Sequence, residues 1–204
     1  MTVCVATMFN WNYGTSERPD IGPAFLTASD RMLTAGAIEY EPAKFKVGFL
    51  SKHALLLIAG NYATHSEAVL NVQRQLRSGG QIDVREIAEL YGQQIRQFRL
   101  RQAAQRDLAP FGLDENTFIT KQREMAPSLT VDLANQMQNH RVDVEAIIVG
   151  LDNVAAYLLH IDSDGFVSCH NDSGFLSIGI GSHHSNSLLM GLPYTSNNIG
   201  YASA

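Results

Sequence analysis

Several features that define other protein classes are scarce in this sequence of 204 residues. It holds two cysteines, Cys4 and Cys169, which are too few for a disulfide framework and fit a reducing compartment. Its longest apolar run, residues 54–60, falls far short of the roughly 20 residues that a membrane-spanning helix needs. No basic segment followed by an apolar one opens the chain, so no secretory signal is predicted. We therefore expect a cytoplasmic protein without a membrane partner.

Positive charge is also in short supply. Fifteen Lys and Arg stand against 20 Asp and Glu, which gives a net charge of −5. A phosphate-binding face needs clustered Lys and Arg, and here these residues are scattered, which argues against nucleic acid as a partner. The length and the 45% content of hydrophobic residues are typical of one globular domain spanning residues 1–204.

Strand patterns open the sequence. The β-branched and apolar residues 2–9 predict a buried strand, and residues 24–28 predict a second. Between them, residues 10–23 are rich in Asn, Gly, Ser and Pro, which predicts a long loop. Two short strands follow at 44–50 and 54–58, with a turn at residues 51–53.

Helical patterns occupy the middle of the chain. Thr64 and Glu67 are spaced as a capping box, and Asp83 and Glu86 repeat that spacing at the start of a second helix. Beyond residue 106 the pattern weakens, with helical patches at 116–123 and 129–138.

The remaining sequence turns back to strands, which we expect at residues 144–150, 156–161, 166–168 and 177–182. Asp162, Asp164 and Gly165 form a typical hairpin turn between the second and third of these. Strands, then helices, then strands indicate an α+β fold or a sheet-on-sheet core with helices outside.

Four segments in this order resemble the proteasome β-subunit family and its bacterial proteasome-like relatives. The first is residues 2–6, which resemble the mature N-terminal strand of that family. The second, Leu-Thr-Ala-Ser-Asp-Arg at 26–31, is similar to its segment with an essential aspartate. The third is Lys46-Val47 with the Ala59-Gly60 turn, and the fourth runs from residue 148 to the Gly-Ile-Gly-Ser stretch at 179–182. Asp30, Lys46 and Gly60 lie 16 and 14 residues apart, the same intervals as in the family.

The resemblance implies a four-layer αββα sandwich, the fold of the N-terminal-nucleophile (Ntn) hydrolases. It also implies a threonine peptidase without a cofactor that acts on peptides or unfolded polypeptides. Subunits of this family form rings, so a homo-oligomer is expected; whether a separate unfoldase cooperates is left open.

Thr2 becomes the nucleophile in this interpretation once Met1 is removed. A threonine hydroxyl needs a base, and a free α-amine with a pKa of about 7.7–8.0 can serve. While Met1 is attached, that nitrogen belongs to an amide and cannot be a base. The resemblance implies that Lys46 lies beside the hydroxyl and that Asp30 pairs with Lys46. Lys44 is the alternative, because strand alternation puts both lysines on the same face.

The resemblance assigns the remaining site residues as well. Gly60 is expected to donate its backbone N–H to the oxyanion of a tetrahedral intermediate. Ile58 and Tyr62 are expected to flank the pocket for the substrate side chain before the cleaved bond, and Ser182 is the retained serine of the Gly-Ser-Gly-Ser element.

Two departures from the family pattern favour other functions. Ile180 replaces the first serine of that element and cannot form hydrogen bonds through its side chain. The family also continues with further helices and strands after the point where this sequence ends, just as a helix is expected beyond Pro193, so the chain resembles a shortened member or a fragment. A catalytically inactive structural subunit and a small-molecule amidase are the alternatives.

A metal site is not predicted. Four histidines lie in the C-terminal stretch, but no Cys-x-x-Cys or His-x-x-x-His spacing joins them. They are His160, His170, His183 and His184.

Overall fold

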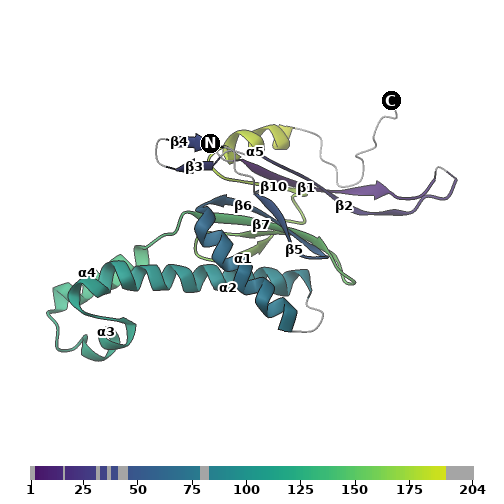
Figure 1. Ribbon diagram of the computed structural model, residues 1–204. Coiled ribbons are helices and arrows are strands. Elements are labelled where there is room, and N and C mark those ends of the chain that lie inside the picture. The colour runs from purple at the N-terminus through teal and green to yellow at the C-terminus, as the bar shows by residue number, and fades with distance from the viewer. Residues whose placement is uncertain are drawn as a thin grey trace.

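In the described residues, two larger antiparallel sheets, a two-stranded one and a group of helices build the protein (Figure 1). Its computed structural model describes residues 3–15, 17–30, 33–35, 38–40, 46–78 and 83–191. One sheet has the strand order β10-β1-β2, the other has the order β5-β6-β7-β8-β9, and β3 (Leu33–Ala35) pairs with β4 (Ile38–Tyr40). The predicted α+β class is confirmed.

The three-stranded sheet consists of β1 (Cys4–Asn12), β2 (Ile21–Ser29) and β10 (Phe175–Ile178). Its β1–β2 hairpin is longer than predicted, because pairing continues to Asn12 opposite Ile21. The side chain of Asn12 accepts hydrogen bonds from the amides of Gly14 and Asp20 and so closes the tip. Pro23 is tolerated on β2, the outer strand of this sheet. The expected loop over residues 10–23 is therefore wrong at both ends.

The five-stranded sheet follows the predicted pattern closely. The Asp162 side chain accepts hydrogen bonds from the amides of Asp164 and Phe166, and Gly165 has a φ of +76°, which confirms the predicted hairpin turn. The strands are β5 (Val47–Ser51), β6 (Ala54–Gly60), β7 (Val144–Leu151), β8 (Ala156–Ile161) and β9 (Val167–Cys169).

Two long helices follow β6. Helix α1 (Tyr62–Ser78) begins two residues earlier than the expected box at Thr64. Asn61 is the cap, because its side chain accepts hydrogen bonds from the amides of Ala63 and Thr64; Thr64 is buried inside the helix. The prediction of a capping box at Thr64 and Glu67 is thus wrong. Helix α2 (Val84–Ala103) is capped by Asp83 as predicted.

The helices that follow extend away from the sheets (Figure 1). Helix α2 continues through a π-helical turn and a 3₁₀ turn to α3 (Glu115–Lys121) and α4 (Pro127–Asn139). Both short helices coincide with the predicted patches. None of the described helices has the length and apolar character needed to cross a membrane.

The last described element is a helix where a strand was expected. Strand β10 ends at Ile178, Gly179 adopts a φ of +91°, and α5 (Ser182–Gly191) begins soon afterwards. Since a left-handed glycine breaks strand geometry, the predicted strand over 177–182 is wrong beyond Ile178. The helix expected after Pro193 lies outside the described residues.

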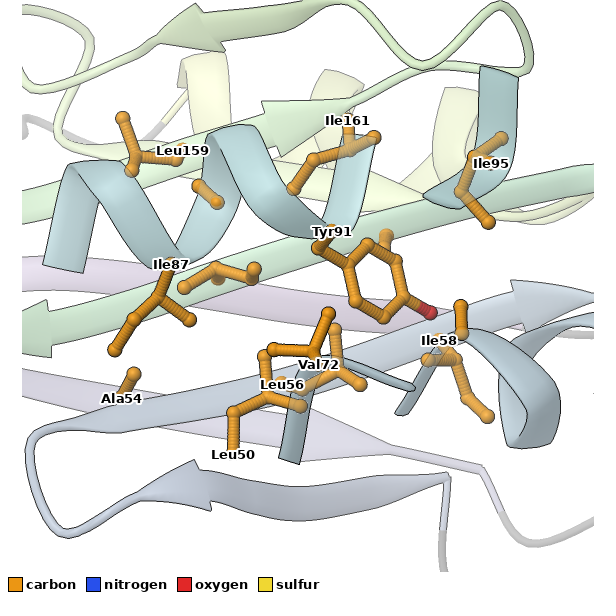
Figure 2. Packing of buried hydrophobic residues seen from close by; sticks show 14 of the residues in the cluster. Leu50, Ala54, Leu56, Ile58, Val72, Ile87, Tyr91, Ile95, Leu159 and Ile161 are labelled. Carbon is orange, nitrogen blue, oxygen red and sulfur yellow. The ribbon is translucent and has the colours of Figure 1, made fainter. Parts of the chain in front are cut away.

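Apolar side chains form two cores, one on each face of the five-stranded sheet. Successive strand residues point to opposite faces, so Ile147 and Ile148 belong to different cores. Helix α5 contacts β10 and β1 on the three-stranded sheet. The helix-facing core, under α1 and α2, includes Leu56, Ile58, Val72, Ile87, Tyr91, Ile95, Leu159 and Ile161 (Figure 2). The inter-sheet core consists of Cys4, Ala6, Leu57, Ala59, Ile147, Val149, Leu158 and Ile178.

Candidate active site

An ion pair lies where β1 begins, β2 ends and β5 begins. The ammonium of Lys46 is 2.8 Å from Oδ1 of Asp30, and Lys46 is only 4% exposed. The same Asp30 oxygen accepts a hydrogen bond of 3.3 Å from the amide of Val3. The Asp30 amide in turn donates to the Val3 carbonyl at 3.0 Å. Asp30 therefore holds the start of β1 and the lysine together.

The second carboxylate oxygen of Asp30 is an unused acceptor within the described part of the chain. This Oδ2 atom is buried and has no hydrogen-bond partner there. A buried carboxylate oxygen without a donor is costly, so this atom is a ready acceptor for a group that binds beside Lys46.

The predicted nucleophile and the competing lysine cannot be located in the same way. Met1, Thr2 and Lys44 all lie outside the described residues. Val3 is covalently joined to Thr2, however, and its amide is the one that contacts Asp30. The amide that follows Thr2 in the sequence therefore lies at the ion pair.

Gly60 ends β6 in a conformation that favours glycine. Its φ is +93°, and a Cβ added there would lie 2.2 Å from the Asp143 carbonyl oxygen. The next amide, that of Asn61, donates to that carbonyl at 2.6 Å. Both the backbone angle and the close contact explain why a glycine stands at this turn.

A cavity of about 450 Å³ opens between β5, β6 and α1. Its volume lies in the range of small-ligand sites, roughly 300–1,000 Å³. Ile58 and Tyr62 both line it together with Lys46, so these three predicted residues are brought together. Gly48 also lines it, and a Cβ added at Gly48 would meet no atom within 4 Å. The other lining residues are Phe49, Leu56, His65, Ser66, Val69, Leu70 and Gln73.

Ser182 is placed at the first turn of α5. Its amide donates to the Gly179 carbonyl, and its own carbonyl accepts from the Ser177 hydroxyl at 3.1 Å. Ile180, in the position of the family's first serine, is 79% exposed. The recorded contacts of Ser182 therefore anchor α5 on β10.

Sequence reasoning missed the position of Cys4. Its thiol is fully buried and donates to the Ile58 carbonyl at 3.2 Å. Burial raises its pKa from 9.0 to about 12, although the nearby charge of Lys46 acts in the opposite direction. Since the thiolate is the reactive form, this thiol is not a nucleophile at neutral pH.

Sequence reasoning also missed His65, which lines the cavity. Its Nε2 is 2.8 Å from the Ala59 carbonyl oxygen, and its Nδ1 is 2.6 Å from the hydroxyl of Tyr91. A lone histidine on a helix carries no sequence signal for such contacts, because its partners are brought to it only by the folded chain.

The C-terminal histidines do not form a metal centre within the ranges that the structure describes. The His160 and His170 rings lie 6.0 Å apart, edge to face. No group of three or more His, Cys, Asp or Glu side chains is arranged to hold a metal ion in those ranges.

Comparison of the sequence with models of known protein families gives no match, and comparison with curated proteins gives none either.

Proposed function

We propose that this chain is a threonine-type N-terminal-nucleophile amide hydrolase, a proteasome-like peptidase that works through an acyl-enzyme on Thr2. The proposal includes the four-layer αββα sandwich of that class. It is supported by α1 and α2 covering one sheet, α5 contacting the other, and an apolar core between the two sheets.

One observation carries the proposal. A single oxygen of Asp30 accepts hydrogen bonds from the Lys46 ammonium and from the amide that directly follows Thr2. A nearly buried lysine thus shares one Asp30 oxygen with the amide that follows, in sequence, the residue whose hydroxyl would have to be activated. Its positive charge favours the negative charge that develops on that hydroxyl and on the substrate oxygen.

The chemistry then follows in two steps. The Thr2 hydroxyl adds to the amide carbonyl while its proton passes to the α-amine. The resulting oxyanion accepts a hydrogen bond from the Gly60 N–H. The C–N bond then breaks, and the α-ammonium returns the proton to the leaving amine. Water then adds to the ester with the α-amine as base, and release of the acid restores the hydroxyl.

The cavity beside Lys46 would take the substrate side chain before the cleaved bond. Its walls are largely apolar, with Leu56, Ile58 and Val69 among them, so large apolar side chains are the expected preference. Gly48→Val would put a side chain into open space at the cavity wall. In this variant we expect kcat/KM for a peptide with leucine before the cleaved bond to fall about tenfold relative to a peptide with alanine there.

Intact-mass and covalent-labelling measurements test the nucleophile. The purified protein should lack Met1, and a peptide epoxyketone should add once, to the N-terminal peptide. Thr2→Ala should abolish the addition. Retention of Met1 in the cellular product, or labelling that survives Thr2→Ala, would overturn the assignment.

Matched lysine variants test the ion pair. Lys46→Met should slow labelling at least a hundredfold, whereas Lys52→Met, in the exposed β5–β6 turn, should label at the wild-type rate. Because Lys46→Met leaves the Asp30 carboxylate unpaired, the double variant Asp30→Asn/Lys46→Met serves as a control for folding. Near-normal labelling of Lys46→Met would refute the role of this lysine.

A catalytically inactive structural subunit is the second candidate. It is favoured by Ile180, which cannot assist an α-amine. Assembly into a homo-oligomeric ring without labelling of Thr2 in a chain that has lost Met1 would decide for this candidate.

A further inference from the structure

We propose that His65, held by Tyr91, is a positioning residue that fixes the Ala59–Gly60 peptide and thereby aims the Gly60 N–H. This inference rests on the function proposed above, in which that N–H binds the oxyanion. His65 is an internal residue of α1 and acts on the oxyanion only through the Ala59–Gly60 peptide.

The contacts of the imidazole ring settle its protonation. His65 is 1% exposed and Tyr91 is fully buried. A backbone carbonyl only accepts hydrogen bonds, so the Nε2 atom that contacts Ala59 must carry the proton. Nδ1 then accepts from the Tyr91 hydroxyl at 2.6 Å. The result is a chain of two hydrogen bonds from α2 through α1 to the end of β6.

Burial keeps the ring neutral, which this chain requires. Loss of solvation lowers the pKa of His65 from 6.5 to about 4, against weaker raising effects of the Ala59 carbonyl and of Asp143. At neutral pH the ring therefore has one donor and one acceptor, and both are used. Tyr91 lies over the sheet with its hydroxyl toward Ile58 (Figure 2), which is next to Ala59.

The geometry of the peptide bond transmits the contact. In a planar trans peptide, the carbonyl of one residue and the N–H of the next point in opposite directions. A donor that holds the Ala59 carbonyl, 2.8 Å from Nε2, consequently fixes the direction of the Gly60 N–H. Gly60 has no side chain to restrain its own backbone, so the His65 contact adds to the pairing of β6 with β7 in setting its orientation.

Three variants separate positioning from simple packing. His65→Leu removes the donor and keeps an apolar side chain of similar size, while His65→Gln restores an N–H that can reach the Ala59 carbonyl. Val72→Ala, also on α1 and fully buried, is the control for lost stability. Each is assayed well below its own unfolding temperature.

We expect His65→Leu to lower kcat about ten- to hundredfold with KM changed less than about twofold, because loss of an oxyanion donor acts on the transition state. His65→Gln should recover kcat to within about fivefold of the wild type, and Val72→Ala should match the wild type. Equal kcat values for His65→Leu and Val72→Ala, or equal impairment of the Leu and Gln variants, would overturn the proposal.

A measurement on the neighbouring amide keeps the inference independent of catalysis. The Asn61 amide follows Gly60 and donates to the Asp143 carbonyl at 2.6 Å, so its hydrogen exchange should accelerate at least about tenfold in His65→Leu and remain near the wild-type rate in His65→Gln. If Thr2 of the wild type fails to label while this exchange pattern holds, the proposed function is wrong and the clamp is right. Unchanged exchange in His65→Leu would show that His65 does not restrain the peptide.

Discussion

The two cores differ in their size and in the length of the side chains that fill them. The helix-facing core is filled by branched aliphatic residues around Tyr91, from both long helices and four strands. The inter-sheet core is smaller in the described residues and includes Cys4, Ala6 and Ala59, which are short. Cys4 follows Val3, which bonds to Asp30, and its thiol bonds to the Ile58 carbonyl, so this core reaches the end where Asp30 and Lys46 meet. Stability is therefore expected mainly from the first core, and chemistry at the edge of the second.

Neighbouring isoleucines on β7 compare the two cores directly. Ile148→Ala, in the helix-facing core, should lower the free energy of unfolding by about 4 kcal/mol, and Ile147→Ala, in the inter-sheet core, by about 3 kcal/mol. Both residues are fully buried, so the difference reflects their surroundings. Urea unfolding measures both values. A larger loss for Ile147→Ala would reverse the assignment of stability to the cores.

Acid should weaken the helix-facing core through His65. The pKa of His65 is about 4 in the folded protein, whereas that of an ordinary exposed histidine is 6.5. Between these pH values the unfolded chain therefore binds a proton at His65 that the folded chain does not. Stability is complete above pH 6.5 and falls as the pH drops toward 4, by about 3 kcal/mol. Chemical denaturation across this range should show a slope that His65→Leu removes.

His160 provides the comparison for this pH dependence. Burial also lowers its pKa, and Glu145 opposes that effect. Alternation along β8 puts it on the inter-sheet side, with Leu158. His160→Leu should therefore leave most of the acid sensitivity in place. A wild-type slope in His65→Leu would show that the sensitivity arises elsewhere.

Gly60 ends β6, directly after Ile58 of the helix-facing core and Ala59 of the inter-sheet core, and a side chain there should be poorly tolerated. Gly60→Ala combines a positive φ with a 2.2 Å approach to Asp143, so we expect a loss of about 2 kcal/mol or more. Gly112→Ala has a positive φ but open space around the Cβ, and should cost about 1 kcal/mol. Thermal unfolding of both variants separates the cost of the close contact with Asp143 from the cost of the positive φ. Equal losses of stability would show that the backbone angle alone matters.

The smallest effect is expected outside both cores. The Asp83 side chain accepts a 2.6 Å hydrogen bond from the Glu86 amide at the start of α2. Asp83→Ala should cost about 1 kcal/mol and leave the labelling of Thr2 unchanged. Altered labelling would mean that the start of α2 is coupled to the site.

Sequence patterns predicted the elements whose burial is simple. Strands β6, β7 and β8 are mostly apolar on both faces, interrupted only by Glu145 and His160, and these runs fell where the structure has them. The outer part of the β1–β2 hairpin was missed because it pairs without much burial, so Asn, Gly and Pro dominate its composition. The cap of α1 was misplaced by three residues because Asn61 and Thr64 are both good caps, and only the turn at Gly60 decides between them.

The site could be predicted only in part. The pairing of Asp30 with Lys46 came from a family resemblance, since alternation alone does not separate Lys46 from Lys44. The contacts of His65 could not be predicted, because Tyr91 lies 26 residues away and only the packing of α1 on α2 brings the two side chains together.

The buried thiol of Cys4 lies between the two sheets, so its rate of alkylation reports on their separation. Cys169 is exposed, so an alkylating reagent should modify it quickly and Cys4 much more slowly. Alkylation of Cys4 requires β1 to separate from β6, because in the folded structure the Cys4 thiol is bonded to the Ile58 carbonyl. The rate of Cys4 alkylation therefore reports how readily β1, which begins two residues after Thr2, separates from β6.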